Sequence, residues 1–171
     1  MKGLIFLFFV IGISILFFSC SQDNPTSPGT NKTDLVTKFS GAEKFIAMHN
    51  PGTWTPLPNG HSLGEGGVYE YRDEASDSRV SGKVMFYVIG VFDSTFSGKF
   101  WGTGELTPDT GGSWDLKVVG ERIATKGSFA DVIGHGKGTL EGMVAQWTYT
   151  RLEPEKDDFT FDGFIIEQSK N

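Results

Sequence analysis

The side chains that most often carry catalysis or bind metals are few in this chain, and they are widely spaced. The histidines, none of which pairs with another at a spacing of two or four residues, are His49, His61 and His135. A zinc site usually takes three or four ligands from His, Cys, Asp and Glu, and the single cysteine is Cys20. No Gly-x-Ser-x-Gly nucleophile elbow occurs. We therefore expect no metal site, no cofactor and no assignable catalytic residue.

The acidic pairs stand beside turn residues. Asp73-Glu74 and Asp157-Asp158 are the clearest examples, and their surroundings favour solvated loop charges. Glu153 and Glu155 could join Asp157-Asp158 in a loose Ca²⁺ site, because Ca²⁺ prefers oxygen ligands, but the spacing matches no known calcium loop. A second alternative places His61 with Glu65 and Glu70 at the mouth of the folded domain.

The N-terminal segment carries the most informative pattern. Lys2 precedes an uncharged run from Gly3 to Ser19, and this run ends at Cys20. A positive start, an apolar centre and a small residue before the cut are typical of a secretory signal. Because the cysteine directly follows Ser19, the segment resembles the signal of bacterial lipoproteins. In that family the signal peptidase cuts before the cysteine, which is then acylated.

Two other interpretations of this segment stay open. A permanent membrane helix needs about 20 apolar residues, and the stretch from Leu4 to Phe18 supplies fewer. A plain secretory signal cut elsewhere would leave a lone thiol outside the cytoplasm. The resemblance implies palmitate or a similar acyl chain on Cys20, each buried methylene contributing about 0.8 kcal/mol to anchoring. It also implies a place in the bacterial cell envelope, on the outer membrane if the cell is Gram-negative.

The chain divides into three parts on this interpretation. Residues 1–19 form the signal peptide, residues 20–33 the lipidated cysteine and a flexible tether rich in Pro, Ser and Thr, and residues 34–171 a β-barrel domain. Without the signal, 14 basic and 21 acidic residues leave a formal charge of −7. An acidic chain without a basic cluster excludes nucleic acid as an expected partner. The sequence does not identify a protein partner.

Alternation of apolar and polar side chains predicts β-strands. In residues 114–121, Trp114, Leu116 and Val118 share one face, opposite the charged residues. Residues 142–152 and 159–167 alternate in the same way. Residues 84–92 are apolar on both faces, which predicts a strand that is central in its sheet or covered by another element. Residues 35–48 fit either a short helix or an opening strand.

About eight strands in about 135 residues, joined by short turns, predict an all-β domain. We expect a single antiparallel up-and-down barrel, because closure removes unpaired strand edges. A two-sheet β-sandwich is the alternative. The 23 glycines suit the bends that a barrel requires. The side chains expected in the core are Phe86, Trp114, Leu116, Val118, Trp147 and Ile165.

Four segments resemble small secreted bacterial β-barrels of the allene-oxide-cyclase-like, calycin type. They read SDSRVSG (76–82), FSGKFWGTGEL (96–106), GGSWDLKVVG (111–120) and GHGKGTLEGM (134–143). The resemblance covers about residues 65–168 and consists of structural glycines and tryptophans. It implies a barrel fold. No catalytic residue of the plant cyclases matches a position in this chain.

Aromatic residues and glycines together predict a ligand cavity. Trp54 lies in residues 49–56, which we expect to form an irregular loop because of their proline and glycine content, and a loop tryptophan can stack on a ligand. Between residues 96 and 106, Phe96, Phe100 and Leu106 should face inward, and the glycines among them should leave a void. We expect a cavity near Trp54, Phe100 and Trp147 that takes a small apolar or aromatic ligand.

Three classes of function follow. The first is an envelope-anchored barrel that binds a small apolar ligand. The second is a non-catalytic interaction or structural module of the envelope, which a lumen filled by Phe and Trp would favour. The third is a cyclase- or isomerase-like enzyme, which an unpaired inward Asp or Glu would favour.

Overall fold

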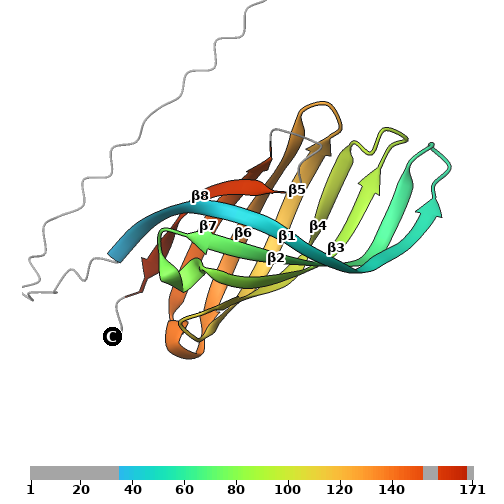
Figure 1. Cartoon of the computed structure of the whole chain (residues 1–171). Coiled ribbons are helices and arrows are strands. Elements are labelled where there is room, and N and C mark those ends of the chain that lie inside the picture. Colours follow the sequence, from blue (N-terminus) through green and yellow to red (C-terminus); the bar gives the residue numbers. More distant parts are fainter. Residues whose placement is uncertain (1–34, 152–157, 169–171) are drawn as a thin grey trace, which may run out of the picture. The chain divides into compact units, whose positions relative to one another are not determined.

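The computed structural model describes residues 35–151 and 158–168 (Figure 1). Eight antiparallel strands follow one another in chain order around a closed barrel, and β8 pairs with β1 to complete the ring. The strands are β1 (Leu35–Pro56), β2 (Ser62–Ala75), β3 (Gly82–Phe92), β4 (Gly98–Pro108), β5 (Ser113–Ile123), β6 (Gly127–Lys137), β7 (Met143–Arg151) and β8 (Phe159–Glu167). The predicted up-and-down barrel is therefore confirmed, and the sandwich alternative is wrong.

Several predictions concern residues outside the described part of the chain. They are the signal peptide, the tether, lipidation of Cys20, and the contribution of Glu153, Glu155 and Asp157 to a calcium site. Within residues 35–151 and 158–168, no helix is long and apolar enough to cross a membrane.

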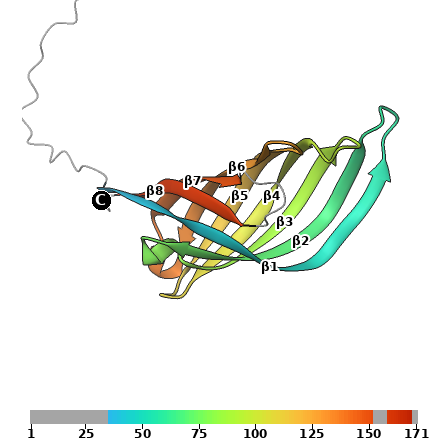
Figure 2. The ribbon, with the colours of Figure 1, turned by 45° about the horizontal axis from the view of Figure 1, so that its top comes forward.

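Strand β1 shows which of the two alternatives for residues 35–48, a short helix or a strand, is correct. It also contradicts one prediction. The segment is a strand, and the strand continues through residues 49–56, where we expected an irregular loop. Two register shifts against β2 absorb the irregular sequence, between Phe45 and Ala47 and between Met48 and Asn50. β8 pairs with β1 only as far as Glu43, so the second half of β1 pairs with β2 alone. This second half of β1 is a free edge (Figure 2), and it contains Pro51, a residue type that sheets accept at their edges.

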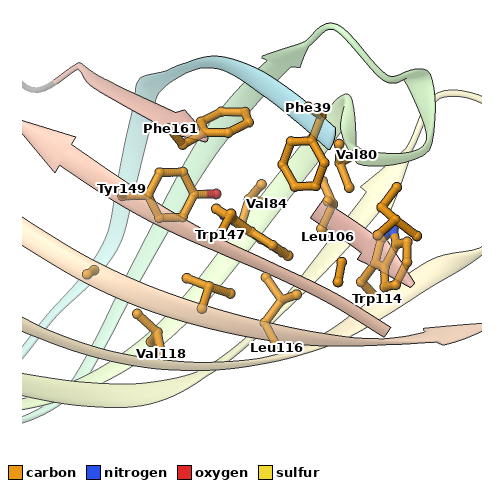
Figure 3. Close-up of a cluster of buried hydrophobic side chains, with 14 of the residues drawn as sticks. Phe39, Val80, Val84, Leu106, Trp114, Leu116, Val118, Trp147, Tyr149 and Phe161 are labelled. Atoms are coloured by element: carbon orange, nitrogen blue, oxygen red, sulfur yellow. The ribbon is translucent and has the colours of Figure 1, made fainter. Parts of the chain in front are cut away.

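The core lies inside the barrel, on the inward faces of the strands. All six side chains expected there are buried: Phe86, Trp114, Leu116, Val118, Trp147 and Ile165. Aromatic rings pack edge to face through the centre, with Tyr149 at 5.3 Å from Phe161 and 6.1 Å from Trp147 between ring centroids (Figure 3). Residues 84–92 were expected to form a strand that is central in its sheet or covered by another element. They belong to β3, which lies between β2 and β4. Its outward Tyr87 is exposed, so no other element covers that face there.

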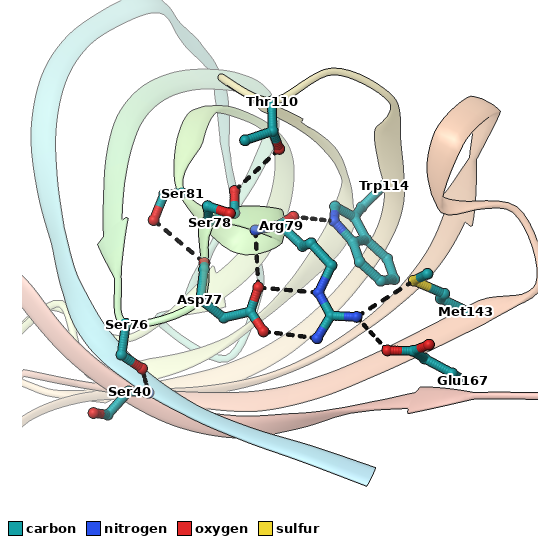
Figure 4. Close-up of polar contacts among 10 residues, drawn as sticks. All are labelled: Ser40, Ser76, Asp77, Ser78, Arg79, Ser81, Thr110, Trp114, Met143 and Glu167. Carbon is teal, nitrogen blue, oxygen red and sulfur yellow. Dashed lines mark hydrogen bonds and ion pairs between the residues drawn. The ribbon is translucent and has the colours of Figure 1, made fainter. Parts of the chain in front are cut away.

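One end of the barrel is sealed. The short helix η1 (Ser78–Val80) places Val80 in the core, and η2 (Gly138–Leu140) does the same with Leu140. Arg79 ties η1 to the strands around it: its guanidinium bonds Asp77 at 2.7 Å and also pairs with Glu167 (Figure 4). The indole nitrogen of Trp114 donates to the Arg79 carbonyl at 2.7 Å.

The strands of the barrel pair completely within the described part of the chain. Each strand finds both of its neighbours between residues 35 and 167, and the ring closes within the same range. Side chains from these strands, together with Val80 and Leu140, form a continuous hydrophobic core within the described residues. Residues 30–171 therefore form a suitable unit for solution experiments.

Candidate binding pocket

The end of the barrel opposite η1 contains a cavity of about 440 Å³. Strand β3 leaves η1 at Gly82 and reaches the cavity with Val88, Gly90 and Phe92, which line it. All eight strands contribute to the wall, and most of the lining side chains are aromatic or aliphatic. A volume of this size lies in the range of small-molecule sites. The barrel thus combines a packed, sealed half with a half that is hollow.

Three aromatic rings form the rim of the cavity. The ring centroid of Trp54 lies 5.8 Å from that of Phe92 and 5.8 Å from that of Phe96. The Trp54 indole lies over Gly64, its neighbour on β2, where a Cβ atom would come within 3.0 Å of the ring. Its nitrogen donates to the Pro51 carbonyl at 3.3 Å. With 42 % of its surface exposed, Trp54 can contact solvent and pocket contents.

The position of Phe96 differs from the prediction. We expected an inward strand residue, but β4 begins at Gly98, and Phe96 lies in the preceding turn with 57 % of its surface exposed. The Asp93 carboxylate holds this turn by accepting hydrogen bonds from the backbone N–H groups of Thr95 (2.8 Å) and Ser97 (3.0 Å). Phe96 has a φ of 60°, a conformation that is uncommon for a bulky residue. This backbone geometry turns its ring toward Trp54.

The cavity does not arise where the glycines of β4 predicted it. A Cβ atom on Gly98 or Gly102 would lie 2.0 Å from a backbone oxygen of β3, so the close approach of that strand takes up the space. The ring of Phe86 covers Gly104. The glycines that do line the cavity are Gly64, Gly67 and Gly90.

The three residues predicted to contact a ligand do not lie together. Trp54 and Phe100 line the cavity, and the Phe100 ring lies against Gly120 on the neighbouring strand. Trp147 is buried deeper, against Phe39 and Tyr149, and is not among the described residues that line this cavity. Ligand contact by these residues stays a prediction.

A buried pair of acidic side chains lies where the cavity meets the core. Glu43 on β1 and Asp73 on β2 are direct cross-strand partners, 2 % and 1 % exposed. The Tyr149 hydroxyl donates to Asp73 Oδ2 at 2.7 Å. Among the described residues, Glu43 Oε1 and Asp73 Oδ1 have no hydrogen-bond partner. Glu43 and Tyr149 line the cavity.

Burial makes these groups hold their protons. It raises the pKa of Glu43 well above its ordinary value, and the neighbouring Asp73 raises it further. Burial raises the pKa of Asp73 to about 8, although the hydrogen bond from Tyr149 and the charge of Arg72 act in the opposite direction. The pKa of Tyr149 also rises, chiefly through burial. Burial therefore favours the neutral form of the Glu43 carboxyl group, which can donate a hydrogen bond.

Sequence reasoning missed this pair. Glu74 fits the prediction of a solvated charge, since it is exposed and pairs with Lys44 at 2.8 Å, but the prediction is wrong for Asp73. The sequence contained a usable signal, because a period of two places Glu43 on the same face as the buried Phe39. Asp73 likewise shares its face with Tyr71.

A row of polar side chains on three adjacent strands also lines the cavity. Ser128 on β6 is the cross-strand partner of both Arg122 on β5 and Arg151 on β7, and all three line the cavity. Arg151 donates to Ser128 Oγ at 3.1 Å, and its guanidinium lies 5.0 Å from the centroid of the Phe159 ring. We refer to Arg122, Ser128 and Arg151 as the arginine row.

The histidines do not join these groups. His49 Nε2 lies 2.6 Å from Glu70 Oε2, and His61 bonds to Asn59, while His135 is exposed on β6. In residues 35–151 and 158–168, no three His, Cys, Asp or Glu side chains gather as metal ligands would, so His61, Glu65 and Glu70 form no such cluster.

A comparison with known protein families and with curated proteins found no match to this chain.

Proposed function

We propose that this protein is a lipid-anchored barrel of the bacterial cell envelope that binds one small apolar ligand. The observation that carries the binding role is the cavity of about 440 Å³, walled by aromatic side chains at one end of a barrel whose other end is sealed. An eight-stranded barrel has room for one small ligand when its inward side chains leave space. A lumen filled throughout by Phe and Trp would have favoured an interaction module instead.

The anchoring part of the proposal comes from the sequence of the N-terminal segment. Lys2, the apolar run and the Ser19-Cys20 junction support cleavage before Cys20 and acylation of that residue. The resemblance to allene-oxide-cyclase-like, calycin-type barrels belongs to the same proposal. The up-and-down topology agrees with it, but a fold does not identify a ligand.

Binding of N-phenyl-1-naphthylamine, a neutral aromatic probe, tests the pocket. A ligand that binds only the folded state stabilises it by RT ln(1 + [L]/Kd), so the probe should raise the melting temperature of residues 30–171. Trp54→Ala should weaken the probe's affinity several-fold, because the rim loses one of its rings. Trp101→Ala is the matched control, since Trp101 has the same 42 % exposure but lies on the outward face of β4.

Two results would contradict the binding proposal. One is the absence of any thermal shift at millimolar concentrations of the probe. The other is an equal loss of affinity in Trp54→Ala and Trp101→Ala, which would place the probe outside the pocket.

The neutral Glu43 carboxyl group favours one second candidate, an isomerase-like enzyme. In an apolar pocket it could protonate a carbonyl oxygen while water removes an adjacent C–H proton, and reversal in heavy water would leave deuterium on that carbon. Deuterium uptake by acetophenone, followed by proton NMR, should then be faster with the native protein than with Glu43→Gln. Equal rates would remove this candidate.

A further inference from the structure

The charge inside the pocket is distributed unevenly. Among the described residues, its wall has one carboxyl group, Glu43, and two guanidinium groups, Arg122 and Arg151. Guanidinium groups stay charged at all physiological pH values. Burial raises the pKa of Glu43 and so favours its neutral form, which carries no charge to balance the two guanidinium groups.

Of the two guanidinium groups, that of Arg122 has the fewer hydrogen-bond partners. Arg122 continues the inward face of β5 that begins with Trp114, and it is partly buried at the open end. Within residues 35–151 and 158–168, its Nε atom is buried without a hydrogen-bond partner, and no carboxylate lies within ion-pair distance of its guanidinium. Burying a charged donor without an acceptor costs free energy. A bound anion would satisfy this group.

Long-range attraction does not account for this arrangement. The chain has a formal charge of −6, so its overall field repels anions. That field is screened over about 8 Å at physiological ionic strength, whereas a direct contact in a partly buried site is screened much less. Selection of an anion would thus depend on the arginine row itself.

We propose that the ligand of this pocket is an aromatic carboxylate. Its rings lie among the aromatic side chains near Trp54 and Phe100, and its carboxylate accepts hydrogen bonds from Arg122. Ser128 and Arg151 lie next to that position along the row. An arginine can bind a carboxylate through two parallel N–H···O bonds, which gives directional as well as electrostatic preference. This inference rests on the proposed binding function and names the class of ligand.

A displacement assay with two matched competitors tests it. Residues 30–171 are loaded with N-phenyl-1-naphthylamine, and its fluorescence is followed as 2-naphthoate or 2-acetylnaphthalene is added. The two competitors share the same rings and nearly the same shape, but only the first is an anion. In the native protein, 2-naphthoate should displace the probe at the lower concentration.

Substitution of the arginine shows where the preference originates. Arg122→Gln should reduce the preference for 2-naphthoate at least tenfold and change the affinity for the neutral probe much less than the affinity for 2-naphthoate, whereas Arg122→Lys should keep part of the preference. Lys117→Gln is the control for net charge, because Lys117 is exposed on the outward face of the same strand. It should leave the preference unchanged.

The outcomes separate the two proposals. If neither the probe nor the competitors bind, the proposed function fails, and this inference fails with it. If the probe binds but the native protein does not prefer 2-naphthoate, only the inference is overturned. A preference that survives in Arg122→Gln overturns it as well. Should Arg122→Gln fail to fold, Arg122→Lys replaces it: a reduced preference for 2-naphthoate supports the inference, because lysine cannot form the two parallel N–H···O bonds, and a preference equal to native contradicts it.

Discussion

The buried acidic pair should make the stability of the barrel fall as pH rises. In the unfolded chain Glu43 and Asp73 lose their protons near pH 4. In the folded barrel, burial raises both pKa values, that of Asp73 from 3.8 to about 8. Between these limits the folded state binds more protons than the unfolded state, so the free energy of unfolding decreases with pH. The stabilisation is fully present below pH 4 and is lost as pH rises through the window.

The magnitude follows from the number of protons involved. Each extra proton bound by the folded state contributes a slope of about 1.4 kcal/mol per pH unit. For Asp73 alone, the loss between pH 5 and pH 7 is about 3 kcal/mol, and Glu43 adds to it. Two other carboxylates change the free energy of unfolding in the opposite direction. Asp77 accepts hydrogen bonds from Arg79, and Asp93 accepts them from Thr95, and these bonds lower both pKa values. Their effect falls below about pH 4, outside this range.

Urea unfolding of residues 30–171 at pH 5, 6 and 7, followed by tryptophan fluorescence, measures this slope. Asp73→Asn is the key variant, because its amide oxygen can still accept the hydrogen bond from Tyr149 but the group no longer titrates. Its slope should be smaller than native by about 1.4 kcal/mol per pH unit. Stability that rises from pH 5 to pH 7, or an unchanged slope in Asp73→Asn, would refute the assignment of neutral buried carboxyl groups.

Three further predictions follow from the sequence and the packing. Cys20→Ala should abolish labelling by radioactive palmitate in cells, and equal labelling of native and variant chains would contradict lipidation. In the same urea titration, Gly102→Ala should lower the free energy of unfolding by at least about 2 kcal/mol, because the added Cβ would lie 2.0 Å from the Tyr87 carbonyl oxygen. Thr103→Ala, at the exposed neighbouring position, is the control and should have little effect on the free energy of unfolding. The isolated segment 30–171 should unfold cooperatively with a β-type circular dichroism spectrum, and a double minimum at about 208 and 222 nm, the signature of helix, would show that it does not fold as described.

The inward residues of β5 and β7 could be predicted from the chain alone. Trp114, Leu116 and Val118 alternate with charged residues, and Trp147 occupies the same kind of position on its strand. A strand turns successive side chains to opposite faces, so this local period identifies the buried face without knowledge of the partner strands. The same regular alternation, with turns at short intervals, indicated a barrel.

The site depended on contacts that no local pattern contains. Glu43 and Asp73 meet only because β1 and β2 pair in one particular register, and two register shifts interrupt that pairing farther along β1. The glycines of β4 suggested empty space, yet the approach of β3 takes it up, whereas the cavity lies at the end where Trp54, Phe92 and Phe96 gather. Alternation assigns a side chain to a face, but the register between strands and the volume of neighbouring rings set which groups meet and where space remains.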